Sequence, residues 1–214
     1  MVITERLPGR PTVLLIGAVR GLAEEVRPVQ SELDAFDPAA VAVSLSPEEA
    51  EALTQYFVGT PTEPVVPLSS SEASHAVGLA RIADVQVPAP ALLSAVDWAT
   101  SRGRPVVGAD PPEDAYAEMF AAHIGYFELV RRTLRERSLV KRPPEVESPE
   151  EYALAWDRTM QPGSGSERLA HARDDYAAER IRRLGNAHST VAFVVDRERF
   201  DSFRSTFRTN PEPA

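Results

Sequence analysis

The sequence feature that most constrains the fold is a series of short apolar runs that alternate with segments of helical periodicity. The four runs read TVLLIGAV, AAVAVSL, RPVVGAD and STVAFVV, at residues 12–19, 39–45, 104–110 and 189–195. Continuous apolar runs of this length are typical of strands buried on both faces, and intervening helices are typical of parallel sheets. The sequence therefore predicts an α/β fold: a small, mostly parallel sheet of about four strands flanked by helices. Its first two strands should run parallel, with a right-handed crossover.

Helix signals lie between these runs. Apolar spacing predicts a helix over residues 22–36, with a kink or restart at Pro28. Ser-x-x-Glu patterns predict capped helix starts at Ser46, Ser148 and Ser164, and Gly185 marks a helix end.

The C-terminal half is the most helical part of the prediction. One long helical region is expected over residues 113–141. We expect a single domain over residues 1–214, with a helix-rich cap or interaction segment at about 111–165.

Composition and charge exclude several classes of protein. The 214 residues are 43% hydrophobic, so the chain has enough apolar side chains for a core. The net charge of −9 argues against nucleic-acid binding through phosphate contacts, and the absence of cysteine excludes disulfides and thiolate metal sites. There is no secretory signal and no apolar run of about 18 residues, so we expect a soluble, cytoplasmic protein with no membrane span.

Common catalytic motifs are missing from the sequence. It contains no P-loop, no G-x-G-x-x-G after the first apolar run and no G-x-S-x-G. Its four histidines, His75, His123, His171 and His188, do not pair at the spacing of metal ligands. We therefore predict no metal and no cofactor.

The segment 169–184 forms an amphipathic wheel. Six residues form its apolar arc: Leu169, Ala172, Tyr176, Ala177, Ile181 and Leu184. Arg173 and Arg180 fall near the middle of this arc, where a guanidinium needs a partner or a wet pocket. Arg180 is interpreted as snorkelling or ion-paired, whereas a functional and a structural role stay open for Arg173. Asp110, at a predicted strand end, is read as a turn or cap residue or as a secondary site candidate.

The order of these segments resembles the TraB family, which is related to the Tiki, ChaN and erythromycin-esterase proteins. Three stretches carry the likeness: IGAVRGLAEEVRPVQSELDAFDPAAVAVSLSPEE, HARDDYAAERIRRL and VAFVVDRERF, with PAPALLSAVDWA and PVVGAD between them. The likeness spans the whole chain and is closest to small archaeal-type members. In that family the first and last strands end in Gly-x-x-His, the second strand ends in Glu-Leu, and metal-dependent hydrolases are thought to use the two histidines and the glutamate.

This chain departs from the family pattern at those positions. The first motif reads Gly17-Ala-Val-Arg20, the glutamate position is Ser44, and the second motif ends at Arg199. The helical arginine is retained as Arg173. Arginine has no free lone pair for a metal, so the resemblance implies a protein in which the hydrolase motifs are degenerate.

Two interpretations of the altered site remain open. If Gly17, Arg20, Ser44, Arg173 and Arg199 converge, the arginines could form an anion pocket for a phosphate or carboxylate, with Asp110 and Arg180 as secondary members. In the other interpretation each arginine pairs with a local acid, for which Asp110, Asp196 and Glu198 are the candidates, and the site is closed.

The sequence leads to three alternative functions. The first is a TraB-like pseudoenzyme that acts as a binding or regulatory module for a small anionic ligand or a protein partner. The second is an active metal-dependent hydrolase of peptidase or esterase type, with ligands such as Asp110, Glu118 and His123. The third is an assembly protein that forms homo-oligomers through residues 111–165.

Overall fold

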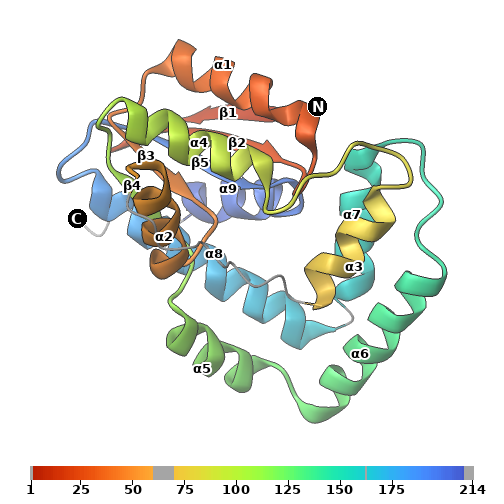
Figure 1. Cartoon of the computed structure of the whole chain (residues 1–214). Coiled ribbons are helices and arrows are strands. Elements are labelled where there is room, and N and C mark those ends of the chain that lie inside the picture. Colours follow the sequence, from red (N-terminus) through yellow and green to blue (C-terminus); the bar gives the residue numbers. More distant parts are fainter. Residues whose placement is uncertain (1, 60–69, 162, 210–214) are drawn as a thin grey trace.

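The computed structural model describes residues 2–59, 70–161 and 163–209. Its sheet has the strand order β1-β2-β5-β3-β4, in which β1 is antiparallel to β2 and all other neighbours are parallel. Figure 1 shows this sheet with helices on both faces, which confirms the predicted α/β class. The strands are β1 (Ile3–Leu7), β2 (Thr12–Ala18), β3 (Ala40–Val43), β4 (Val106–Gly108) and β5 (Thr190–Asp196).

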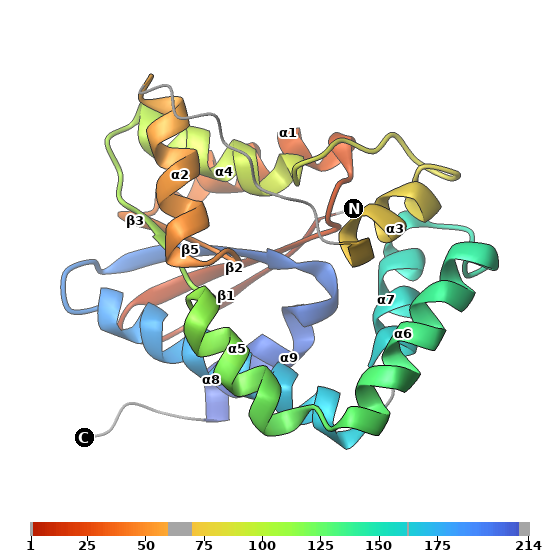
Figure 2. The same cartoon turned by 60° about the horizontal axis from the view of Figure 1, so that its bottom comes forward.

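The helices fall into two layers and a side group. Helices α1, α2 and α4 cover one face of the sheet, α8 and α9 cover the other, and α3, α6 and α7 stand beside the sheet (Figure 2). The first seven helical elements are η1 (Ala23–Glu25), α1 (Val26–Phe36), α2 (Pro47–Phe57), α3 (Ser70–Leu79), α4 (Pro90–Ser101), α5 (Glu113–His123) and α6 (Tyr126–Lys141). The others are α7 (Pro149–Met160), α8 (Ser164–Leu184), η2 (Arg197–Arg199) and α9 (Phe200–Thr209).

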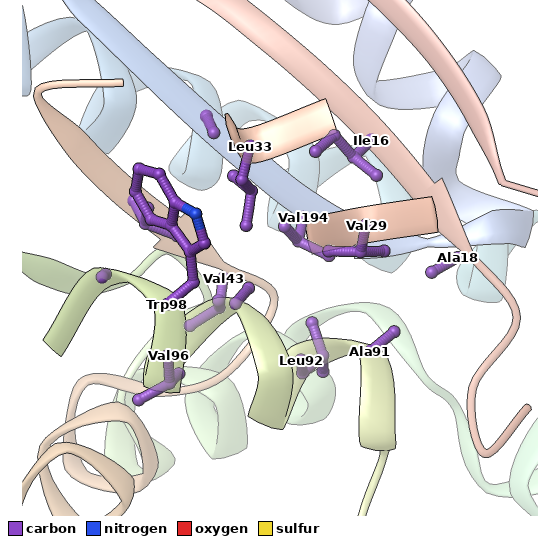
Figure 3. Packing of buried hydrophobic residues seen from close by; sticks show 14 of the residues in the cluster. Ile16, Ala18, Val29, Leu33, Val43, Ala91, Leu92, Val96, Trp98 and Val194 are labelled. Atoms are coloured by element: carbon purple, nitrogen blue, oxygen red, sulfur yellow. The ribbon is translucent and has the colours of Figure 1, made fainter. Parts of the chain in front are cut away.

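Alternate residues of each central strand supply the two cores. Ile16 and Val194 point toward α1 and α4, where they meet Val29 and Leu92 (Figure 3). Their sequence neighbours, such as Phe193, face α8 and α9 instead. Because both faces are covered, the strands are apolar on both sides between their ends, which explains why they read as continuous runs.

A third apolar cluster lies beside the carboxyl edge of the sheet. Tyr152 and Trp156 of α7 pack with Leu79 of α3, Leu139 of α6 and Val19, which follows β2. This satellite core joins the side helices to the sheet, so the helix-rich segment borders the edge where the parallel strands end.

The sequence prediction differs from the structure at β1 and at the long helical region. Strand β1 was not predicted, because it is a half-exposed edge strand of mixed composition. The expected helix over 113–141 is two helices, which separate at Ile124 and Gly125. The restart expected at Pro28 comes two residues earlier: η1 ends at Glu25 and α1 begins at Val26, so Pro28 lies in the first turn of α1.

Two of the three predicted helix caps are present. The Ser46 and Ser148 hydroxyls accept the backbone N–H groups of Glu49 and Glu151. The third prediction is wrong, because α8 already begins at Ser164 and the carboxylate of Glu128, in α6, accepts the backbone N–H of Ser166 at 2.7 Å. A side chain from another helix thus takes the place of the predicted local cap.

The wheel of α8 is also shifted from its predicted orientation. Asp174 and Ala178, which lie outside the predicted apolar arc, are buried together with Leu169, Ala177 and Ile181. Tertiary partners of Asp174, described below, account for the shift. In the part of the chain that the structure describes, no helix has the length and apolarity required to cross a bilayer.

Candidate functional site

The candidate site lies at the carboxyl edge of β2, β5, β3 and β4. After β2 the chain passes to α1 on one face of the sheet, and after β5 it passes to α9 on the other. Adjacent parallel strands whose connections leave on opposite faces open a crevice at this edge, where open α/β proteins bind ligands. The polar residues that follow the four strands gather here.

Arg20 and Asp196 face each other across this crevice. The Nε and Nη2 atoms of Arg20 donate to the two carboxylate oxygens of Asp196 at 3.0 and 2.9 Å, and Nη1 donates to Glu72 of α3. The charge of Asp196 holds the pKa of Arg20 above its usual range. Arg20 therefore links β2, β5 and α3 and is neutralised by two carboxylates.

More carboxylates surround this pair. Burial, together with the nearby charge of Asp196, raises the pKa of Glu198 to about 8, and Glu198 Oε2 has no hydrogen-bond partner among the described residues. Burial also raises the pKa of Asp157. At neutral pH the raised pKa keeps Glu198 mainly protonated, so the charge beside Arg20 comes from its two partners, Asp196 and Glu72.

A second ion-pair cluster lies at the end of β4. Asp110 accepts from Arg199 Nη1 at 2.8 Å and from Arg173 Nη2 at 2.7 Å, and Arg199 also donates to Asp174. Ser202 of α9 donates to the other oxygen of Asp174. Burial alone would raise the pKa of Asp110, but Arg199 and Arg173 outweigh it and hold that pKa well below its usual range.

The structure thus brings three predicted arginines to one edge but leaves none of them without a carboxylate. Arg20 is paired with Asp196, whereas Arg173 and Arg199 share Asp110. An anion at this place would have to displace those carboxylates. For Asp110 and Asp196 the geometry therefore matches the second interpretation, in which each arginine pairs with a local acid.

The other three predicted site residues, Gly17, Arg180 and Ser44, are described by their packing and hydrogen bonds. A Cβ on Gly17 would come within 2.8 Å of side-chain atoms of Ile3 and Phe200, so close packing explains this glycine. The Arg180 Nε donates to the carbonyl of Gly108. The Ser44 hydroxyl is buried with no hydrogen-bond partner among the described residues.

The alternative hydrolase ligands do not gather in one place. Asp110 is held by two arginines, whereas Glu118 is exposed on α5 and His123 ends that helix. Within the described ranges there is no group of three or more His, Asp or Glu side chains placed to hold a metal ion.

An apolar pocket opens beside Arg20, between α2, α3 and α4. It is small, with a cavity volume of about 50 Å³. Its apolar wall consists of Leu45, Leu53, Ala76, Val87, Pro88, Ala89, Leu92 and Leu93, and its polar rim of Arg20, Glu49, Glu72 and His75. Sequence reasoning missed this pocket, although Glu72 and His75 are three apart on one helix and therefore share a face.

His75 is an uncharged member of this rim. Its ring packs against Tyr152 and Trp156, with ring centroids 5.3 and 5.5 Å away. Burial lowers the pKa of His75 to about 4. At neutral pH the rim therefore carries two carboxylates, one arginine that is already paired and a neutral imidazole.

Comparison with known proteins leaves the family open. No protein-family model matches the chain, and no curated protein gives a significant match. The likeness to the TraB family stays a prediction from the order of the sequence motifs.

Proposed function

We propose that this protein is a small-molecule binding module that does not use the metal-dependent hydrolysis of the proteins it resembles. The positions at which the resemblance implies histidine ligands are Arg20 and Arg199, and both guanidiniums are engaged by buried carboxylates. Arginine offers no lone pair to a metal, so these side chains supply binding and rigidity rather than metal coordination.

The pocket beside Arg20 is the single observation that carries this proposal. It lies at the strand edge where α/β folds bind ligands, and its wall is apolar with few polar groups at one end, as in most small-molecule sites. Arg20, which is held by Asp196 and Glu72, forms part of its polar rim.

The chemistry of the rim favours a cationic ligand. Glu49 and Glu72 line the pocket, Asp196 lies behind Arg20, and His75 is neutral. An amine with a short apolar body would place its charge near the two glutamates and its carbon atoms against Leu53 and Leu92. A carboxylate or phosphate would instead meet these acids directly.

A thermal-shift screen tests the ligand class. We would compare hexylamine and phenethylamine with hexanoate and phenylpropionate, and add inorganic phosphate, Mg²⁺, Mn²⁺ and Zn²⁺. Because a ligand that binds only the folded state raises the melting temperature, the amines should stabilise the protein by a few degrees at about 100 times Kd.

Matched variants place the effect in the pocket. Glu49→Gln removes one charge but keeps a side chain that can cap α2, and Ala76→Leu narrows the pocket at a half-exposed position. Both should weaken the amine effect at least several-fold, whereas Glu51→Gln, on the exposed side of α2, should not.

Three outcomes would overturn the proposal. Stabilisation by phosphate or hexanoate that Arg20→Ala abolishes would establish an arginine anion pocket instead. A metal effect that neither pocket variant changes would favour the hydrolase. No shift with any of these compounds would show that the pocket is not a binding site.

A further inference from the structure

Helices α5 and α6 bury very little of their surface within the chain. No residue of α5 is buried, and Leu139 is the only one of the sixteen residues of α6 that is. Helices of this length are marginal in water by themselves and normally depend on packing. The contacts that the described chain supplies to these two helices are therefore few.

The outer face of α6 is strongly apolar at its beginning. Tyr126, Phe127 and Leu134 are 75%, 84% and 59% exposed, and Val130 lies between them. Residues spaced by three, four and seven lie on one side of a helix. Clustered apolar side chains with such exposure usually mark an interaction surface.

The outer face of α5 has the complementary shape. Tyr116 and Phe120 are half-buried, and the guanidinium of Arg173, in α8, lies 5.5 Å from the centre of the Tyr116 ring. The exposed positions include three alanines, at residues 117, 121 and 122. Small side chains let another helix approach closely, so this face can accept the large side chains of α6.

The two helices also carry opposite charge. Helix α5 has three acidic residues, Glu113, Asp114 and Glu118, and no lysine or arginine. Helix α6 has five basic residues, Arg131, Arg132, Arg135, Arg137 and Lys141, against two acidic ones. One of these two acids, Glu128, is turned inward to the start of α8, so the exposed charge of α6 is mainly positive.

We propose that α5 and α6 form the interface of a two-fold symmetric dimer, in which α5 of each copy packs on α6 of the other. The two helices diverge from a common corner at Ile124 and Gly125 (Figure 2). A two-fold axis that passes between them would place α5 of the second copy on α6 of the first, and α6 of the second copy on α5 of the first. The α5–α6 contact therefore forms twice, as in any isologous interface. Pairing α6 with a second α6 would bring like charges together. This inference is independent of the proposed ligand pocket.

Charge reversal in two separate variants provides the test. Variant one carries Arg131→Glu and Arg137→Glu, and variant two carries Glu113→Arg and Glu118→Arg; all four positions are exposed. Sedimentation of the wild-type protein should give twice the chain mass of 23.4 kDa. Each variant alone should be monomeric, because both of its interfaces then join like charges.

Mixing the two variants is the decisive step. In a mixed dimer the reversed α6 meets the reversed α5, and the two unmodified helices meet each other, so an equimolar mixture should again give twice the chain mass. Phe127→Ser should also weaken the dimer about tenfold or more, whereas Val58→Ser, at an apolar residue that is 61% exposed after α2, should not.

Several outcomes would contradict the dimer. These are a wild-type monomer at 100 µM, a dimer that charge reversal leaves intact, or two variants that stay monomeric when mixed. A monomer that binds vesicles of anionic lipid and loses this binding with Phe127→Ser would assign the face to a membrane surface instead. Far-ultraviolet circular dichroism of every variant checks that it is folded.

Discussion

Arg20 and Asp196, 176 residues apart in the sequence, form a two-point ion pair across the boundary between β2 and β5. Each residue comes at the end of a parallel strand, so the pair joins two strands whose connections leave on opposite faces of the sheet. The pair closes the base of the crevice and holds Arg20 at the rim of the apolar pocket.

Asp196→Asn should destabilise the protein. The substitution leaves Arg20 with one carboxylate fewer in a site where Asp196 is almost fully shielded from water. Removing one member of a buried pair costs about 3–5 kcal/mol, and the partial exposure of Arg20 reduces our expectation to about 1–3 kcal/mol of unfolding free energy. Urea denaturation at pH 7 measures this change.

Glu179→Gln is the matched control. It removes the acid of the Arg183–Glu179 pair, whose side chains are 71% and 62% exposed. We expect less than about 0.5 kcal/mol here. Equal changes in the free energy of unfolding would mean that the Arg20–Asp196 pair stabilises the protein no more than an exposed ion pair does.

Asp110→Asn should also lower the free energy of unfolding, because the carboxylate of Asp110 forms ion pairs with both Arg173 and Arg199. We expect a loss of about 2–4 kcal/mol at pH 7. The folded-state pKa of Asp110 is well below its usual range, so its contribution is present above about pH 4 and is lost as pH falls toward the folded-state value. The difference between wild type and variant should therefore shrink in acid titrations of stability; a difference that grew below pH 4 would contradict this assignment.

Gly17→Ala should destabilise the fold by about 1–3 kcal/mol, because the added Cβ overlaps side-chain atoms of Ile3 and Phe200. Gly125→Ala is the control, since no other part of the described chain lies within 4 Å of the place that its added methyl group would take, and its φ is ordinary. Thermal unfolding of both variants compares them. If Gly17→Ala were as stable as wild type but lost ligand binding, Gly17 would belong to the site rather than to the packing.

Glu198→Gln should change how stability depends on pH. Burial and Asp196 raise the folded-state pKa of Glu198 to about 8, above its value of 4.5 in the unfolded chain. The folded state therefore binds more protons, and stability falls as pH rises between these two values. At pH 8 the uncharged glutamine should be more stable than wild type by up to about 4 kcal/mol.

The comparison is read from urea denaturation at pH 5, 6.5 and 8. The advantage of Glu198→Gln should grow with pH and be smallest at pH 5, where we expect about 1 kcal/mol or less. A constant difference would show that Glu198 does not titrate in this range. His75 has the opposite pH dependence, because its folded-state pKa is below its ordinary value. The unfolded chain binds the proton of this histidine more readily, so His75 lowers the free energy of unfolding only at acidic pH.

Local pattern was enough to predict the α/β class and the four parallel strands, β2, β3, β4 and β5. The three inner strands β2, β3 and β5 are buried on both faces, so their apolar runs are uninterrupted, and the short edge strand β4 is itself apolar. The cap at Ser46 depends only on residues within one turn. Strand β1 escaped prediction because an edge strand with one half-exposed face has no such run.

The contacts within the candidate site could be predicted from the sequence only in part. The sequence placed Arg20 and Arg199 after predicted strands and left open whether they converge, and it offered Asp110 and Asp196 as acids that could pair with them. Which of these acids each arginine meets was decided by contacts between distant segments, such as Asp174 with Arg199 and Ser202. The same holds for Glu128, which replaced the local cap predicted for α8.

The sequence by itself thus determined the elements whose signals are local: buried strands, helix periodicity and caps formed within one turn. Only the tertiary structure decided the pairing of the buried charges and the position of the pocket, because a buried charge takes whichever partner the packed chain brings within hydrogen-bonding distance.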